Sequence, residues 1–162
     1  MSSTENWKQL GNDSFKNSDF SAAIGFYSKA IEADPSDPKP LVNRSIARAS
    51  LLQWKESAFD ARKAIQIDPK YTKAHFRFVR ALLAMKKVKD ARFALSMAFK
   101  ECGEQTKDFK DLEEEIFNLT GIPLRPKSTD FEVIGELGDG NFSKVYKTFL
   151  KATKQVFAIK VS

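Results

Sequence analysis

The sequence predicts an all-α fold of three stacked helical hairpins and a capping helix, followed by a short truncated β segment. The first observation is a step of 34 positions, which separates Pro35 from Pro69. The second is that small and apolar residues repeat the same step, as in Ala30, Ala64 and Ala98, Phe20, Trp54 and Val88, and Ile31, Ile65 and Phe99. A fixed period of this size with small residues at the packing points is typical of stacked helix-turn-helix repeats.

The expected repeats cover 4–37, 38–71 and 72–103. Their helices should lie at about 4–17 and 20–33, then within 38–67, and finally within 72–101. Gly11 and Ala23 are small where paired helices must come close. Asp34-Pro35 and Asp68-Pro69 end the first two hairpins, because proline cannot continue a helix and restricts the residue before it.

A capping helix is expected within 104–120. Phe109, Leu112 and Ile116 give it one apolar side, and Gly121 with Pro123 marks its end. An array of repeats needs such a helix, because its last hairpin would otherwise expose an apolar face. A linker at 121–129 and a further segment at 130–162 complete the predicted organisation.

Composition and charge limit the function classes. The chain has 162 residues, is 42% hydrophobic and carries a net charge of +6, which favours an anionic partner. A single cysteine, Cys102, excludes an internal disulfide and a Cys/His zinc cluster, so no metal site is expected. No apolar run approaches the length of a membrane span, and the N-terminus has no signal core. We therefore expect a soluble, cytoplasmic monomer that binds no membrane.

Five polar side chains fall at registers that should meet in one groove. Lys8 and Asn12 are four residues apart and share one face of the first helix, and Lys73 and Arg77 do the same on the fifth. Asn43 and Arg77 are one repeat apart. The set offers many hydrogen-bond donors and only two acceptors, the amide oxygens. This inventory suits a ligand rich in carboxylates.

Over residues 4–103 these strings resemble the tetratricopeptide (TPR) family. Lys8-Gln-Leu-Gly-Asn12, Asn43-Arg44-Ser45 and Lys73-Ala-His-Phe-Arg77 are similar to the carboxylate clamp of co-chaperone TPR domains. The resemblance implies a right-handed superhelix whose Lys8, Asn12, Asn43, Lys73 and Arg77 bind the C-terminal Glu-Glu-Val-Asp tails of the seventy- and ninety-kilodalton heat-shock chaperones. Such peptide binding requires no cofactor, and we expect a dissociation constant on the order of micromolar, about −8 kcal/mol.

The resemblance is incomplete. Arg48 stands where the family often has an aromatic residue, Val79 where it has a small one, and Ser57 where it has alanine. These differences concern packing and peptide selectivity more than the clamp. Arg80 lies two repeats beyond Asn12, and it either adds a contact to the peptide or is solvated.

A second pattern begins after the linker. Asp130 to Leu137 alternates apolar and polar residues as a strand does, and a glycine-rich turn leads into a second strand. A third strand, Val156 to Val161, follows. This order resembles the start of a eukaryotic Ser/Thr protein kinase small lobe of the AGC group. The resemblance implies a nucleotide site made of Gly138, Gly140, Phe142, Ser143, Val145 and Lys160.

The chain ends two residues after Lys160, before the catalytic motifs of a kinase. We therefore expect no catalytic residue and no phosphoryl transfer from this chain, and at most weak ATP binding. Two functions remain open: a module that binds chaperone tails, and the N-terminal part of a longer ATP-dependent Ser/Thr kinase with the repeats as an accessory. Nucleic-acid binding is disfavoured because basic and acidic residues are interspersed and no RNA-binding motif is present.

Overall fold

The structure is a computed structural model that describes residues 2–103, 106–125, 131–140, 143–150 and 155–161. The chain divides into two compact units, Met1–Leu112 and Glu113–Ser162. The division falls inside the seventh helix, and each unit is described by itself.

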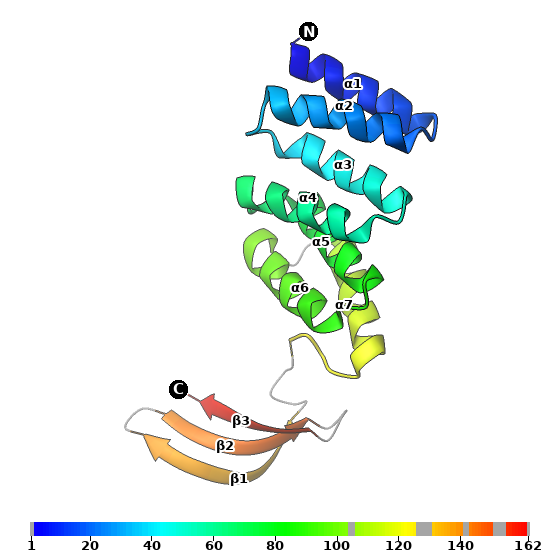
Figure 1. Cartoon of the computed structure of the whole chain (residues 1–162). Helices are drawn as coiled ribbons and strands as arrows, with labels where there is room; N and C mark the ends of the chain where they lie inside the picture. The colour runs from blue at the N-terminus through cyan, green and yellow to red at the C-terminus, as the bar shows by residue number, and fades with distance from the viewer. Residues whose placement is uncertain (1, 104–105, 126–130, 141–142, 151–154, 162) are drawn as a thin grey trace. The chain divides into compact units, whose positions relative to one another are not determined.

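The described residues up to 125 form seven helices, and α1 to α6 make a stack in which each packs on the next (Figure 1). Their bounds are α1 Ser3–Lys16, α2 Phe20–Ala33, α3 Pro38–Ser50, α4 Trp54–Ile67, α5 Thr72–Ala84, α6 Val88–Cys102 and α7 Lys107–Thr120. The helices predicted from the 34-residue step are all present, with ends displaced by no more than one residue. The prediction of an all-α repeat array is therefore confirmed.

Local signals in the sequence set the helix ends. The side chains of Ser2, Asp19 and Asp37 accept hydrogen bonds from backbone N–H groups in the first turns of α1, α2 and α3. The turn inside each hairpin holds one residue with positive φ, namely Ser18, Leu52 or Lys86. These three are again 34 positions apart, so the repeat extends to backbone conformation.

Alanines of the repeated register let the helices approach closely. Ala30, Ala64 and Ala98 are fully buried, as the sequence predicted. Gly11 has the same role in the first hairpin, because a Cβ there would lie 2.5 Å from Cε1 of Tyr27. Tyr27 can therefore cross from α2 beneath α1 and reach the side chain of Asn12.

A buried acid joins the two helices of the second hairpin, and the sequence pattern did not reveal it. Asp60 on α4 is fully buried and accepts hydrogen bonds from both Arg44 and Arg48 on α3, at 2.7 to 2.9 Å. Arg48, noted as a departure from the usual aromatic residue, thus has an electrostatic partner instead of an apolar one.

The predicted apolar side of α7 is buried, because Phe109, Leu112 and Ile116 are at most 1% exposed. Phe109 packs edge-on against Phe99 of α6, with ring centroids 5.7 Å apart. The last hairpin is therefore covered as the capping hypothesis requires.

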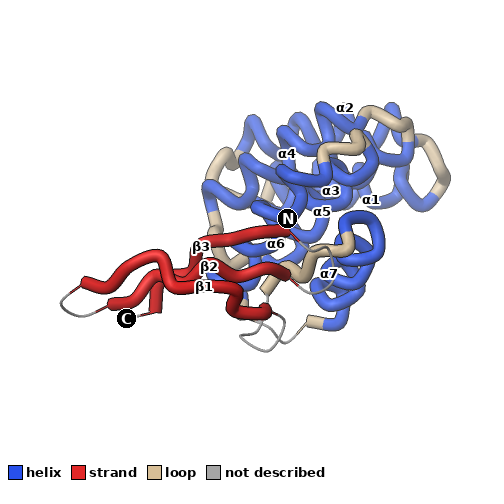
Figure 2. The backbone as a smooth tube through the Cα atoms, turned by 90° about the horizontal axis from the view of Figure 1, so that it is seen from below, coloured by secondary structure: helices blue, strands red, loops and turns tan. Residues whose placement is uncertain are grey.

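Three strands lie side by side in the second unit (Figure 2). They are β1 Phe131–Gly140, β2 Ser143–Leu150 and β3 Gln155–Val161, in the order β1-β2-β3 with both pairs antiparallel. In this register Val145 lies opposite Gly138 on one side and Lys160 on the other. One residue of the predicted nucleotide site, Phe142, lies outside the described residues.

Candidate functional site

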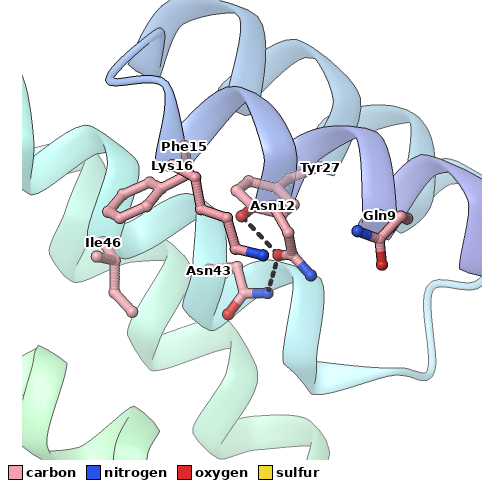
Figure 3. A pocket seen from close by; sticks show the side chains of 7 residues that line it. All are labelled: Gln9, Asn12, Phe15, Lys16, Tyr27, Asn43 and Ile46. Atoms are coloured by element: carbon pink, nitrogen blue, oxygen red, sulfur yellow. Dashed lines mark hydrogen bonds between the residues drawn. The ribbon is translucent and has the colours of Figure 1, made fainter.

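The structure brings two of the five predicted clamp residues together, Asn12 on α1 and Asn43 on α3. The Asn12 Oδ1 atom accepts hydrogen bonds from the Tyr27 hydroxyl at 2.9 Å and from Asn43 Nδ2 at 3.4 Å (Figure 3). Tyr27 is 2% exposed, so its hydroxyl is a fixed support. With its oxygen occupied, the Asn12 side chain presents its Nδ2 group as the donor left for a ligand.

The Asn12–Asn43 pair lines a pocket of about 280 Å³ between α1, α2 and α3. Its complete lining is Gln9, Asn12, Phe15, Lys16, Tyr27, Asn43 and Ile46. We name it the amide pocket. It combines amide groups, one ammonium group and the apolar surfaces of Phe15 and Ile46, which suits a short peptide with both a carboxylate and an apolar side chain.

Lys16 is a site residue that the sequence prediction missed. Its side chain extends toward the Asn12–Asn43 pair in Figure 3. A signal was present, since Lys8, Asn12 and Lys16 follow one another at four-residue spacing on one helix face.

Lys8 is already paired within the chain. Its Nζ lies 2.9 Å from a Glu5 carboxylate oxygen and 3.1 Å from Asp37 Oδ2, and its side chain is only 16% exposed. The hydrogen bonds that Lys8 donates to Glu5 and Asp37 raise the pKa of Lys8 above its ordinary value, against the opposing effect of burial. A ligand carboxylate must therefore compete with two acidic side chains for this ammonium group.

The two predicted cations of the third repeat lie on α5 and do not line the amide pocket. Lys73 is exposed. Arg77 is half-buried, with its guanidinium 5.3 Å from the centre of the Phe76 ring. Burial lowers the pKa of Arg77, which the nearby Asp108 opposes and Arg80 reinforces. Arg80 is exposed and also lies over Phe76, at 5.7 Å.

The segment predicted to bind a nucleotide forms a hairpin and one further strand. Gly138 and Gly140 are in β1, Ser143 and Val145 are in β2, and Lys160 is in β3. The register places Gly138, Val145 and Lys160 in one row across the three strands.

Within the described residues, no three His, Cys, Asp or Glu side chains gather as they would around a metal ion. None of the helices in that part of the chain is both long and apolar enough to cross a bilayer.

Comparison with known sequences finds relatives, some of them named for tetratricopeptide repeats, although no family model matches the chain. Small glutamine-rich tetratricopeptide repeat-containing protein 2 of Mycosarcoma maydis is 35% identical over 91 residues, which is 56% of this chain and 26% of that protein. Human serine/threonine-protein phosphatase 5 is 38% identical over 87 residues, 54% of this chain and 17% of its own length. The E3 ubiquitin-protein ligase CHIP of Arabidopsis thaliana is 29% identical over 162 residues, 98% of this chain and 55% of the ligase. The chain thus spans about half or less of the length of these relatives.

Solved structures agree with the fold. The Arabidopsis OM64 TPR domain matches with a TM-score of 0.67 and 27% identity, covering 72% of this chain and 96% of that domain. A structure described as the TPR2B-domain:pHsp70-complex of yeast Sti1 matches with a TM-score of 0.68 and 26% identity, over 72% of this chain and 98% of the other. A TPR2AB-domain:pHSP90-complex of yeast Sti1 matches with a TM-score of 0.63 and 29% identity, over 72% and 45% of the two chains. The helical part of the chain therefore has the TPR fold, of the type found in co-chaperones.

Proposed function

We propose that the TPR repeats form a protein-interaction module that binds the acidic C-terminal tails of the seventy- and ninety-kilodalton heat-shock chaperones. The observation that carries the proposal is the amide pocket, where Asn12 and Asn43 meet beside Lys16. Amide N–H groups and an ammonium group are the donors that a terminal carboxylate needs.

The similar structures of yeast Sti1 support this choice of ligand, because both are complexes named for Hsp70 and Hsp90. Each likeness covers 72% of this chain. In the proposed mode of recognition, a few side chains bind the C-terminal carboxylate of an extended peptide. They set both the affinity and the direction in which the peptide lies.

In this proposal Lys8 changes partners when the peptide binds. Lys8 would exchange its ion pair with Glu5 or Asp37 for one with a peptide carboxylate. Because the number of ion pairs is then unchanged, Lys8 contributes little to the free energy of binding. Lys73 and Arg77 would contact acidic side chains further along the peptide. The affinity should then remain on the order of micromolar.

The test is titration of the chain with the peptide Met-Glu-Glu-Val-Asp in free-acid and amidated forms. The free acid should bind at least about tenfold more tightly, since charge-assisted hydrogen bonds contribute roughly 1.5–3 kcal/mol. Asn43→Ala and Arg77→Ala should each weaken binding, whereas Lys100→Ala, an exposed cation on α6, should not. Equal affinity of the two forms would remove the clamp assignment.

A second function is favoured by the register of the sheet. We propose that residues 131–161 are the first strands of a Ser/Thr kinase small lobe, in which Gly138, Gly140, Phe142, Ser143, Val145 and Lys160 would contact ATP. The row formed by Gly138, Val145 and Lys160 supports this, because it sets the glycine-rich strand β1 and the lysine of β3 on either side of β2 at the same level.

Titration with a fluorescent ATP analogue and Mg²⁺ tests the second function. Binding should be weak and saturable, and Lys160→Ala should abolish it. Identical binding curves for the unmodified chain and Lys160→Ala would show that the resemblance to a kinase does not extend to ATP binding in this chain.

A further inference from the structure

A wide apolar groove lies between α4 and α6, with α5 as its floor. Its volume is about 1170 Å³, and its lining, which shares no residue with the amide pocket, comes from α4, α5, α6 and the turn between α5 and α6, with Arg48 added from α3. Phe59 on α4 and Phe93 on α6 stand at its edges and are 54% and 70% exposed. Large exposed aromatic side chains around a hollow mark a surface that a partner covers. We name it the α4–α6 groove.

The preceding repeat shows that the fold does not require this apolar groove. One repeat earlier, the counterparts of Phe78, Leu82 and Ala94 are Arg44, Arg48 and Asp60, each 34 positions before. There Arg44 bridges α2 and α4, donating to the Ser28 hydroxyl at 2.9 Å and to Asp60 at 2.7 Å. The earlier position thus holds an ion-paired cluster, whereas its counterpart in the groove holds apolar side chains.

The helices that line the groove favour an occupant whose backbone is α-helical. α4, α5 and α6 satisfy their own N–H and C=O groups, so they offer no strand edge to which an extended peptide could add. An α-helix pairs its own backbone groups, so it can bury an apolar face in the groove without leaving N–H or C=O groups unpaired. Phe59 on α4 and Phe93 on α6, which are one repeat apart at equal register, would flank such a helix on both sides.

The charged side chains at the rim of the groove indicate the charge that its occupant should carry. Lys55, Arg62 and Lys87 line the groove with Glu56 and Asp90, whereas the charge of Arg48 at the end of α3 is paired with Asp60. Cations exceed carboxylates around an apolar floor. We propose that the α4–α6 groove binds an amphipathic helix of a partner protein, with large apolar side chains on one face and carboxylates beside them. This inference is independent of the proposed peptide clamp.

The experiment uses the whole chain and a labelled peptide of roughly 18 residues, long enough to form a helix. Its apolar face carries Leu and Phe at helical spacing, and its flanks carry Glu. A matched peptide has Lys in place of Glu. Fluorescence anisotropy measures the affinity for the chain and for its Phe59→Ser, Phe93→Ser and Leu119→Ser variants. Leu119 is the control because it is 60% exposed on α7 and does not line the groove.

The acidic peptide should bind with a dissociation constant on the order of 10 µM, and Phe93→Ser should weaken it about tenfold. Phe59→Ser should have a similar effect, and Leu119→Ser none. Because Phe59 and Phe93 are exposed, circular dichroism melting should show that both variants remain folded.

Several outcomes would overturn the proposal. Absence of binding, equal affinity for the Lys-flanked peptide, or equal loss in Leu119→Ser would each do so. Dimerisation of the chain that Phe93→Ser abolishes would assign the groove to a second copy. Adsorption to anionic vesicles without peptide binding would assign it to a lipid surface.

Discussion

Lys8 is the residue whose environment most affects the proposed peptide site. Its ammonium group contacts Glu5 within α1 and Asp37 at the start of α3. Asp37 also caps α3 by accepting a hydrogen bond from the Lys39 N–H at 2.9 Å. One carboxylate therefore stabilises a helix end and competes with the peptide for a cation.

Asp37→Asn should separate these two roles, because asparagine caps a helix about as well as aspartate but carries no charge. Affinity for the free-acid peptide should rise about two- to fivefold, since a partly exposed ion pair contributes roughly 0.3–1 kcal/mol. Peptide titration measures the change, with Asp90→Asn on α6 as the control. Weaker binding by Asp37→Asn would mean that Asp37 positions Lys8 for the ligand.

Tyr27 links the amide pocket to the core, and its ionisation should affect stability. Burial raises the pKa of Tyr27 above the ordinary 10.0. A phenol whose pKa is higher in the folded state contributes stability that is complete below pH 10 and declines as the pH rises through the folded-state pKa. Loss of the proton also removes the hydrogen bond to Asn12.

Tyr27→Phe should lower the free energy of unfolding by about 0.5–1.5 kcal/mol at neutral pH, the usual contribution of such a hydrogen bond. The difference in the free energy of unfolding between Tyr27→Phe and the native chain should become smaller above pH 10. Only the native chain has the Tyr27 hydroxyl, so only it loses this contribution as the pH rises. Urea denaturation at neutral and alkaline pH measures both quantities. A difference that stays constant with pH would contradict this account of Tyr27.

At the scale of helices, two glycines offer a matched test of close packing. Gly11 lies in α1 and Gly25 in α2, both away from the helix ends. A Cβ at Gly11 would collide with Tyr27, whereas a Cβ at Gly25 has nothing within 4 Å.

Gly11→Ala should therefore destabilise the chain by about 1–3 kcal/mol through overpacking. Gly25→Ala should stabilise it by roughly 0.5–1 kcal/mol, because alanine restricts the unfolded chain and favours the helix. Gly11→Ala should also weaken peptide binding, because it displaces Tyr27 from Asn12. Urea denaturation measures the change in the free energy of unfolding in each variant. Changes of the same sign in Gly11→Ala and Gly25→Ala would refute the packing argument.

The helices could be predicted from sequence because their positions depend on spacing alone. Ala30, Ala64 and Ala98 repeat where the helix backbones approach each other. The side chain of alanine has no alternative rotamers, so its position follows from that of the backbone. Asn12 and Asn43 were predictable for a related reason, since short amides remain near the backbone that positions them.

Long charged side chains were not predictable to the same degree. Lys8 was expected to face a ligand but pairs with Glu5 and Asp37. Arg44 entered the prediction only within the string Asn43-Arg44-Ser45, and Arg48 only as a difference from the family, but both hold the buried Asp60. Spacing fixes the helix face of such a residue, whereas its partner depends on rotamers and on which acids lie within reach.

At the scale of the whole molecule, the proposed peptide site belongs to one of the two compact units. Lys8, Asn12, Asn43, Lys73 and Arg77 all lie within Met1–Leu112. Among the residues that the structure describes, the three strands pair with one another in the β1-β2-β3 sheet. Peptide affinity should therefore depend on the repeats and on the integrity of their capping helix.

A chain that ends at Arg125 should bind the free-acid peptide within about twofold of the 162-residue chain, since it keeps α1 to α7. A chain that ends at Gly103 should bind less tightly and melt at a lower temperature. It lacks Phe109, which packs on Phe99, and it lacks Asp108, whose charge favours the protonated form of Arg77. Burying an aromatic side chain contributes roughly 1.5–3 kcal/mol, so the loss of α7 should be evident in a thermal melt. If the chain ending at Arg125 loses affinity as the chain ending at Gly103 does, residues beyond α7 take part in peptide binding.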